Sequence, residues 1–230
     1  MAMENNNKTE IENKNDFSVT TFDFFRHGEP EGGNRFRGTV DSALTDKGVT
    51  QLERAFKTFQ HANNTKSDYT LESIISSPRQ RCATMAKQWA EKLNIPLLIE
   101  PELREINFGH WEGKTVAEVE QQSKEQLENY WQHPNQSTPH GGESLQEFHN
   151  RIIHCWQDLQ TTRKAQHSLI VTHGGVIRSI IGDLLGIPLD NLGRLEVPHA
   201  SWSRIRIYHS PGKADWPQLV FHNQATLSAP

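Results

Sequence analysis

The chain has 230 residues, enough for one large α/β domain or two small ones, and its formal net charge at pH 7 is -4. Its lysines and arginines are scattered and form no basic stripe of the kind that nucleic-acid binding needs, so we expect no nucleic-acid partner. No apolar stretch approaches the roughly 20 residues that span a bilayer, and no secretory signal is recognisable, so we expect no membrane partner. Two cysteines, each within a helical pattern, favour a reduced, cytoplasmic location without a disulfide framework.

Residues 1–16 are rich in Asn, Glu and Lys and nearly free of apolar side chains. Such a segment buries too little apolar surface to offset the entropy that it would lose on ordering. The sequence therefore predicts a disordered N-terminal tail over residues 1–16 and a single domain over residues 17–230.

Strand and helix patterns alternate after this tail. The segment after Pro211 has no regular pattern and is predicted to be irregular. The alternation favours an α/β fold with a mostly parallel central sheet over an all-α or all-β fold. Short apolar runs bounded by turn residues predict strands at residues 19–25, 71–76, 96–99, 168–171 and 201–207.

Helix-start signals lie between the predicted strands. One helical pattern begins near Thr45, and a second follows Ser77 as the N-cap with Pro78 at the first helical position. Residues 144–147 have the spacing of a capping box, and a last helix follows His173. Residues 114–142 interrupt the alternation with a polar, helix-prone stretch that ends in prolines and glycines. An insertion of this kind between core elements predicts a lid-like segment.

Basic and imidazole side chains follow three of the predicted strands. Arg26 and His27 end the first strand, Arg79 begins the helix after the second, and His173 ends the strand at 168–171. Ligands bind outside the carboxyl ends of strands in open α/β sheets, so these groups are expected to converge. Guanidinium groups and helix N-termini bind anions, and phosphate in particular. The sequence therefore predicts a phosphoryl site.

The same residues indicate how a phosphoryl group would react. The chain has no Asp-x-Asp pair, no Walker-type glycine loop and no helical pair of histidines at zinc-ligand spacing, so we expect neither a metal nor another cofactor. Fixed guanidinium groups stabilise a phosphoryl transition state, and a neutral imidazole can attack phosphorus in line. His27 is the predicted nucleophile. Glu105 is the predicted proton donor to the leaving group, and it would then activate water against the phosphohistidine.

Several short motifs resemble those of the histidine phosphatase superfamily, and they occur in the order typical of that family. The resemblance implies a three-layer α/β/α sandwich with the phosphoglycerate mutase-like fold, no cofactor, and a catalytic set of Arg26, His27, Arg79, Glu105 and His173. The motifs are Phe25-Arg26-His27-Gly28-Glu29, Leu44-Thr45-Asp46-Lys47-Gly48, Ser76-Ser77-Pro78-Arg79-Gln80-Arg81, Leu103-Arg104-Glu105, Phe108-Gly109-His110-Trp111-Glu112-Gly113 and Thr172-His173-Gly174-Gly175.

Within that family the chain is most similar to α-ribazole phosphatases of cobalamin nucleotide-loop assembly, judged from residues 32–38, 108–113 and 141–145. By this resemblance Arg37, Asn34 and Gly174 are the expected substrate-binding residues. Phosphoglycerate mutases resemble one another in having a longer insertion with basic residues. Here the corresponding stretch, residues 116–142, has Lys124 as its one basic residue besides histidines, which favours a hydrolase.

Other functions remain open at this point. The chain is a candidate for a broad-specificity sugar or nucleotide phosphatase, for a phosphoglycerate mutase, or for a non-catalytic phosphate-binding regulatory module. The expected partner is a small-molecule phosphate ester, and the protein is expected to be a monomer or a homodimer. Trp111, Trp131 and Trp202 are candidates for stacking against the base of a nucleotide-like substrate, although aromatic residues more often pack in a core.

Overall fold

The computed structural model describes residues 17–64 and 70–224. The predicted tail at residues 1–16 lies outside this part of the chain. Within it, six strands form one sheet in the order β3-β2-β4-β1-β5-β6. The strands are β1 (Ser18–Arg26), β2 (Ser73–Ser76), β3 (Leu97–Ile99), β4 (His167–Thr172), β5 (Trp202–His209) and β6 (Trp216–Gln224).

Four neighbouring strands of the sheet, from β3 to β1, are parallel, and β5 and β6 are added antiparallel at one side. The five predicted strands are all present, with bounds that differ from the prediction by no more than two residues. The predicted α/β fold with a mostly parallel central sheet is therefore confirmed.

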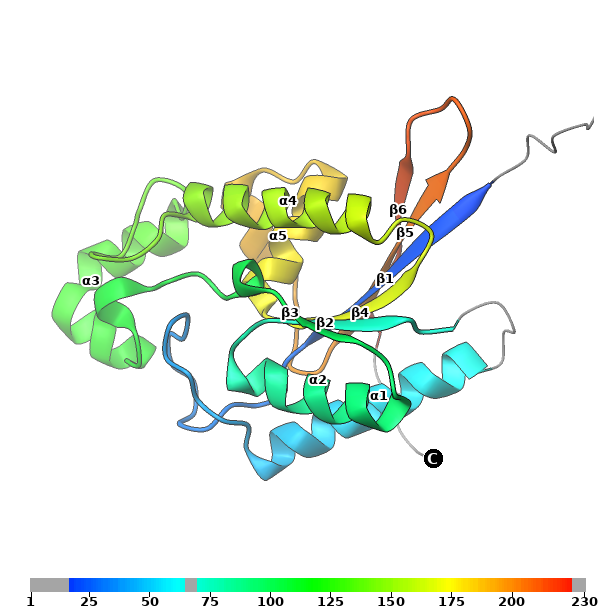
Figure 1. The fold of residues 1–230 in the computed structure, drawn as a ribbon. Coiled ribbons are helices and arrows are strands. Elements are labelled where there is room, and N and C mark those ends of the chain that lie inside the picture. The colour runs from blue at the N-terminus through cyan, green and yellow to red at the C-terminus, as the bar shows by residue number, and fades with distance from the viewer. Residues whose placement is uncertain (1–16, 65–69, 225–230) are drawn as a thin grey trace, which may run out of the picture.

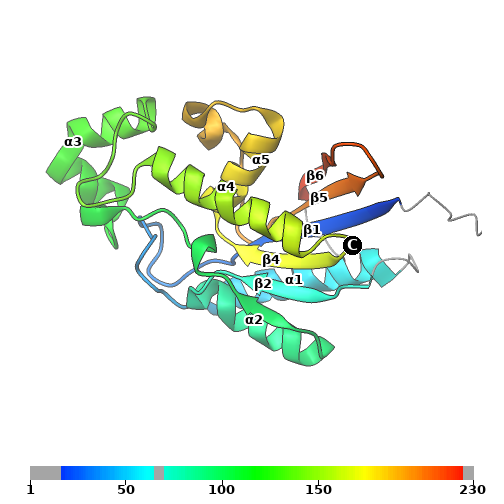
Figure 2. The ribbon, with the colours of Figure 1, turned by 45° about the horizontal axis from the view of Figure 1, so that its top comes forward.

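Helices cover both faces of the sheet (Figures 1 and 2). Phe22 and Phe24 of β1 pack in the same cluster as α4 (Leu145–Thr162) and α5 (Gly174–Leu185). Phe25, on the opposite face, packs with α1 (Asp46–Asn64) and α2 (Gln80–Leu93). Successive strand side chains point to opposite faces, so the consecutive apolar residues of β1 serve two cores at once. This arrangement is the predicted three-layer sandwich.

The predicted lid-like segment contains a helix, α3 (Val116–Gln132), which lies beyond the end of the sheet (Figure 1). Thr115 and Glu118 form a capping box at its start, and the backbone departs from helical geometry at Ser123. A small third apolar cluster joins α3 to the loops next to the sheet. It consists of Phe36, Trp111, Val119 and Leu127, with Phe108 and Tyr130 packed against it.

The prediction of irregular structure after Pro211 is wrong, because β6 pairs with β5 along the sheet edge. Most side chains of β6 are exposed or half-buried, and Trp216 is 69% exposed. A strand of this kind has little apolar periodicity, and it contains Pro217, which sheets tolerate at an edge. Pairing with the β5 backbone therefore forms this strand without an apolar signal in its sequence.

Candidate active site

His27 and His173 are brought together by the sheet. Arg26 and Thr172 are opposite one another in the parallel pairing of β1 and β4, and each histidine follows directly. The His27 N–H donates to the Thr172 carbonyl over 2.9 Å. The two imidazole rings consequently lie 5.2 Å apart, measured between their centroids.

The hydrogen bonds of His27 determine which of its nitrogens can react. Its ring is 6% exposed, and Nδ1 lies 2.7 Å from the Gly28 carbonyl oxygen. A carbonyl oxygen only accepts, so Nδ1 carries the proton and Nε2 keeps its lone pair. Burial, followed by the charges of Arg81 and Arg26, holds the pKa of His27 well below its usual value. His27 is therefore a neutral imidazole with a free Nε2 at neutral pH.

The turn after His27 requires a glycine. A Cβ atom at Gly28 would lie 2.1 Å from the Gly48 carbonyl oxygen, so any side chain would displace the start of α1.

His173 lies behind His27 and is fully buried. Its Nε2 is 2.7 Å from the Ser77 hydroxyl, and burial, Arg81 and His27 lower its pKa well below the usual value. Ser77 is not the N-cap of α2 as predicted, because the helix begins at Gln80 and Arg79 occupies the cap position. Pro78 is therefore outside the helix, and the Ser77 hydroxyl binds His173 while it accepts from the Arg79 N–H over 3.3 Å.

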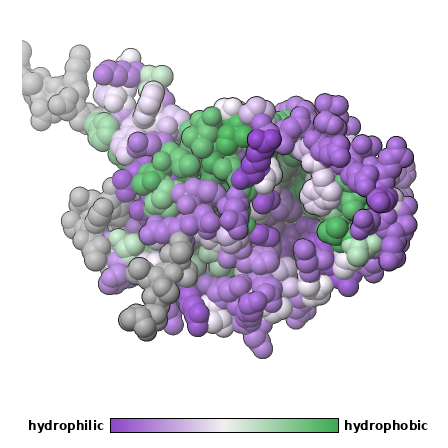
Figure 3. Space-filling model, turned by 180° about the vertical axis from the view of Figure 1, so that it is seen from behind, coloured by the Kyte–Doolittle hydropathy of each residue, from purple (hydrophilic) through white to green (hydrophobic). Residues whose placement is uncertain are grey.

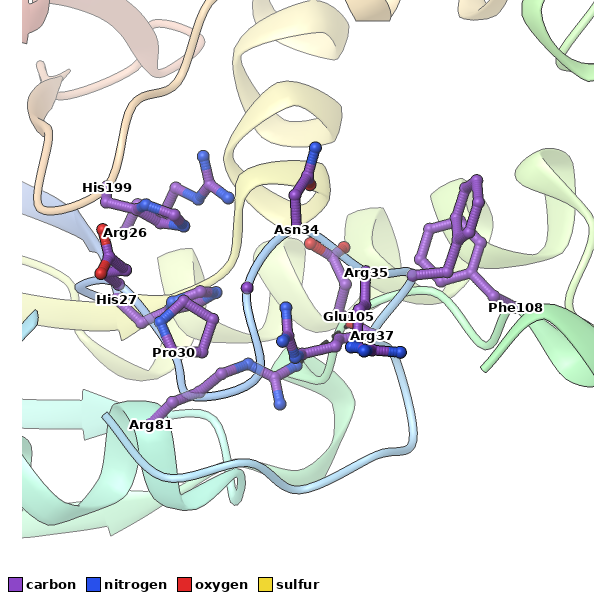
Figure 4. Close-up of a pocket in the computed structure, with 13 residues that line it drawn as sticks. Arg26, His27, Pro30, Asn34, Arg35, Arg37, Arg81, Glu105, Phe108 and His199 are labelled. Carbon is purple, nitrogen blue, oxygen red and sulfur yellow. Dashed lines mark hydrogen bonds between the residues drawn. The ribbon is translucent and has the colours of Figure 1, made fainter. Parts of the chain in front are cut away.

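A cavity of about 360 Å³ opens in front of His27 (Figure 4). Figure 4 shows His27, Arg26 and His199 at one side of it and Glu105 and Asn34 across from them. We call this space the first cavity. Its lining residues are Arg26, His27, Glu29, Pro30, Gly33, Asn34, Arg35, Phe36, Arg37, Arg81, Glu105, Phe108 and His199.

Guanidinium groups supply most of the positive charge in the first cavity. Arg26 donates from Nη1 to the Val197 carbonyl over 2.5 Å. Arg81 is 1% exposed and donates to the carbonyls of Val40 and Arg37 over 2.9 and 3.3 Å. Backbone carbonyls neutralise no charge, so both side chains keep their full positive charge for an anion.

Glu105 is held at the far side of the first cavity. Its Oε2 accepts from the Gly175 N–H over 3.1 Å, at the first turn of α5. A Cβ atom at Gly175 would lie 2.2 Å from Glu105 Oε1, so a glycine is needed for the carboxylate to approach. The Gly175 N–H thus holds one oxygen of the Glu105 carboxylate in place.

A second cavity, of about 300 Å³, adjoins the first and shares Phe36, Glu105 and Phe108 with it. Its walls are mainly aromatic and aliphatic, and they include Tyr130 and Trp131 from α3. Seen from behind, the molecule is mostly hydrophilic, but hydrophobic residues border a hollow on the side of α3 (Figure 3). Glu105 therefore lies between a cationic cavity and an apolar one.

Glu112 holds the loop that carries Arg37. Its carboxylate accepts from the backbone N–H groups of Gly38, Thr39, Val40 and Phe108 over 2.9 to 3.1 Å. Four donors on one carboxylate fix the loop against the walls of both cavities. Glu112 therefore has a structural role.

Comparison with known proteins adds to this geometry. A family model described as histidine phosphatase superfamily (branch 1) matches residues 23–217. The chain belongs to this superfamily. As a histidine phosphatase it is a phosphomonoesterase, and it resembles phosphatases of several small phosphate esters.

Three relatives of this histidine phosphatase are named for different phosphate esters. Glucosyl-3-phosphoglycerate phosphatase of Mycolicibacterium vanbaalenii is 30% identical over 209 residues, which cover 87% of this chain and 84% of the relative. Adenosylcobalamin/alpha-ribazole phosphatase of Salmonella typhimurium is 28% identical over 184 residues, covering 79% and 88% of the two chains. Phosphoserine phosphatase 1 of Hydrogenobacter thermophilus is 27% identical over 184 residues, covering 79% and 84%.

A solved structure also resembles this histidine phosphatase in its fold. Bacillus stearothermophilus YhfR superposes on this histidine phosphatase with a TM-score of 0.74 and is 29% identical, covering 84% of this chain and 95% of that one.

Five of the predicted site residues line the first cavity, and three do not. Those in its lining are Arg26, His27, Asn34, Arg37 and Glu105. His173 lies directly behind His27, and Gly174 lies near the Arg26 side chain, where an added Cβ atom would be 3.4 Å from Arg26 Nε.

The structure places Arg81, and not Arg79, in the lining of the first cavity. The sequence placed Arg79 in the first turn of the helix. In the structure Arg79 is the extended N-cap residue, and Arg81 is the second residue of α2. Both arginines belong to the same motif, so a helix start two residues later would have identified Arg81.

His199 was not predicted. It lies in the loop before β5, where no motif or periodicity marks it, and its ring is 5.5 Å from that of His27.

Two of the candidate tryptophans, Trp111 and Trp202, are buried in apolar clusters, whereas Trp131 is 58% exposed and lines the second cavity.

Two further findings concern metal binding and membrane spanning. Within residues 17–64 and 70–224, no three His, Cys, Asp or Glu side chains are grouped so that they could hold a metal ion. In the same ranges, none of the helices has the length and apolarity that crossing a bilayer requires.

Proposed function

We propose that this histidine phosphatase hydrolyses phosphate monoesters through a phosphohistidine at His27. Nε2 of His27 attacks phosphorus, and the bond between phosphorus and the ester oxygen breaks. Glu105 gives a proton to that oxygen, and the alcohol leaves. Glu105 then takes a proton from water, which attacks the phosphohistidine and releases inorganic phosphate and the neutral imidazole.

The observation that carries this proposal is the unprotonated Nε2 of His27 at the edge of a cavity lined by Arg26 and Arg81. The two guanidinium groups are suited to the equatorial oxygens of the transferring phosphoryl group, whose charge they would offset. His173 and Gly174 lie directly behind this position, at the start of α5. The chain's own side chains supply the positive charge, so the proposed reaction needs no metal ion.

For the substrate, we propose a phosphate ester with a ring-bearing leaving group, and α-ribazole 5′-phosphate as the first compound to test. The second cavity supports a planar or apolar group, because Phe36, Phe108, Tyr130 and Trp131 line it next to Glu105. Residues 114–142 contribute Tyr130, Trp131 and Pro134 to this wall. We propose that this segment determines substrate choice.

A second substrate class is an ester whose leaving group also carries a carboxylate. Arg178 lines the second cavity, and its only hydrogen bond among the described residues runs from Nε to the Leu195 carbonyl over 2.8 Å. The terminal nitrogens of this guanidinium group suit a carboxylate. Glucosyl-3-phosphoglycerate and phosphoserine are the esters of this class to compare.

Acid-quench trapping of the phosphoenzyme tests the mechanism. Wild-type protein mixed with a ³²P-labelled ester should give a labelled protein that is stable in base and labile in acid, and His27→Ala should give none. His154→Ala is the matched control, since His154 is exposed on α4 outside both cavities. Full activity of His27→Ala would rule out this nucleophile.

The same samples separate the alternatives. A regulatory module would bind phosphate without forming a phosphoenzyme, and a mutase would interconvert 2- and 3-phosphoglycerate without net release of phosphate. A hydrolysis panel of α-ribazole 5′-phosphate, glucosyl-3-phosphoglycerate, phosphoserine and nucleotides ranks the substrates by kcat/KM.

A further inference from the structure

The loop before β5 holds His199 rigidly beside the nucleophile. The Ala200 N–H donates to the His27 carbonyl over 3.1 Å, and the Arg26 N–H donates to the Ser201 carbonyl over 3.2 Å. Arg26 also donates from its side chain to Val197. Three hydrogen bonds on both sides of His199 thus attach its loop to the end of β1, so its position depends on the same strand as that of His27.

His199 differs from the other two histidines of the site in its bonding. The ring of His27 is bonded to Gly28 and that of His173 to Ser77. Within the described residues the ring of His199 has no hydrogen bond, although it lines the first cavity, where Figure 4 shows it beside Arg26. Its nitrogens are therefore available to a ligand in that cavity.

The groups that face His199 come from three parts of the chain. Arg26 and His27 lie at the end of β1, Glu29 and Arg37 lie in the following loop, and Lys47 lies in α1. Burial and Arg26 lower the pKa of His199 to about 4, with further contributions from Arg37 and Lys47, and Glu29 opposes them. The Glu29 carboxylate is itself bonded to Lys47 over 2.6 Å.

We propose that His199 is a ligand of the phosphoryl group, and that it takes up a proton when a dianionic oxyanion enters the first cavity. Burial and the charges of Arg26 and Arg37 keep the ring neutral, and a dianion offsets the two charges. The protonated ring then donates a charge-assisted hydrogen bond to an oxyanion oxygen. This inference deepens the proposed function because it concerns the same cavity.

The other imidazoles are less suited to this proton. Nε2 of His27 must keep its lone pair to attack phosphorus, and its Nδ1 is already protonated. His173 is fully buried, and its Nε2 is bonded to the Ser77 hydroxyl. Of the three rings, His199 alone lines the cavity with both of its nitrogens unbonded among the described residues.

Calorimetry with sulfate tests the inference, because sulfate stays dianionic between about pH 5 and about pH 8, where histidines titrate. Titrations at about pH 6 in two buffers of different ionisation enthalpy give the number of protons taken up. Wild-type protein should take up a proton on binding sulfate, and His199→Asn should not. His199→Asn should also bind sulfate roughly tenfold more weakly at about pH 6 and with a smaller loss at about pH 8.

The control is His154→Asn, which should keep both the uptake and the affinity of the wild type. His199→Gln provides a second amide variant, and circular dichroism verifies that each variant is folded. No proton uptake by the wild type, or unchanged uptake by folded His199→Asn, overturns the inference. Sulfate binding requires no turnover, so the result is independent of phosphoenzyme trapping, which tests the proposed function.

Discussion

His27 and His173 follow residues that are paired across two parallel strands, and their rings lie 5.2 Å apart as a result. The hydrogen bond from the His27 backbone N–H to the Thr172 carbonyl maintains this spacing. The relative position of the proposed nucleophile and its partner imidazole is therefore a property of the central sheet. Substitutions in the surrounding loops should change the charge and shape of the site without separating the two rings.

Arg81 should matter more than Arg79 for catalysis. Arg81→Ala removes a cavity-lining guanidinium group, and the loss of one such donor typically reduces kcat by roughly 100- to 1000-fold. Arg79→Ala should reduce kcat/KM by less than about tenfold, since Arg79 is outside the cavity lining. Steady-state kinetics of both variants check this, with thermal melts to verify folding because Arg81 is buried. The reverse ranking would restore Arg79 as the second phosphate ligand.

Glu105→Gln should slow the hydrolysis of alkyl phosphates far more than that of aryl phosphates. An alkoxide needs a proton to leave, and general acid catalysis typically contributes about 100- to 10,000-fold, whereas a nitrophenolate leaves without a proton. The measurement is single-turnover formation of the phosphoenzyme with both substrates. Equal losses would count against Glu105 as the acid.

Trp131→Ala should weaken the binding of ring-bearing esters without destabilising the protein. Trp131 is 58% exposed and lines the second cavity, and an aromatic contact is worth about 0.5–1.5 kcal/mol, or up to roughly a tenfold rise in KM. The KM for phosphoserine, which has no ring, should change less. Trp216→Ala on β6 is the matched control, because Trp216 is also exposed but lies outside both cavities. A similar rise in KM for both esters would mean that the second cavity does not bind the ring.

Removal of metal ions should leave the phosphatase rate unchanged. The proposed mechanism assigns the stabilisation of charge to Arg26 and Arg81, so prolonged dialysis against a chelator removes nothing that it uses. The measurement is the initial rate before and after dialysis. A loss of activity that a divalent cation restores would contradict the mechanism.

The free energy of unfolding should decrease as the pH falls below about 6.5. His27 and His173 have pKa values well below the usual one, so the native state stays neutral while the unfolded chain binds protons. Each of these histidines contributes a slope of up to about 1.4 kcal/mol per pH unit between about pH 6.5 and its native pKa. Urea denaturation at about pH 7.5 and about pH 5 checks the sign, and His27→Asn should reduce the difference. An unfolding free energy that is flat across this range would contradict the neutral state of the two rings.

The parts of the fold that could be predicted are those whose signal is local. The strands β1, β2 and β4 are buried on both faces, so each contains consecutive apolar residues that the sequence alone identifies. The capping box from Ser144 to Glu147 likewise marks the start of α4 correctly. In contrast, β6 forms because it pairs with β5, and its own sequence has no apolar periodicity that predicts this pairing.

The same distinction applies to the site. His27 and His173 directly follow apolar strands, so their convergence follows from the rules for parallel sheets. The choice between Arg79 and Arg81 depends on where α2 begins, and the boundary of a helix is its least predictable feature. His199 lies beside His27 because the neighbouring Ala200 N–H donates to the His27 carbonyl. These two residues are 173 positions apart in the chain, so no local pattern indicated the contact.

Glu105 lines both cavities, whose walls come from different parts of the fold. Strand ends and the first turns of helices in the main sandwich supply much of the cationic first cavity, whereas α3 and its neighbours supply the aromatic wall of the second cavity. Exchange of the α3 segment for that of another family member would therefore alter which alcohol is recognised while leaving bond cleavage intact. In the proposed function, selectivity and reactivity belong to different segments of the chain, so segment grafting is expected to redirect this phosphatase to other esters.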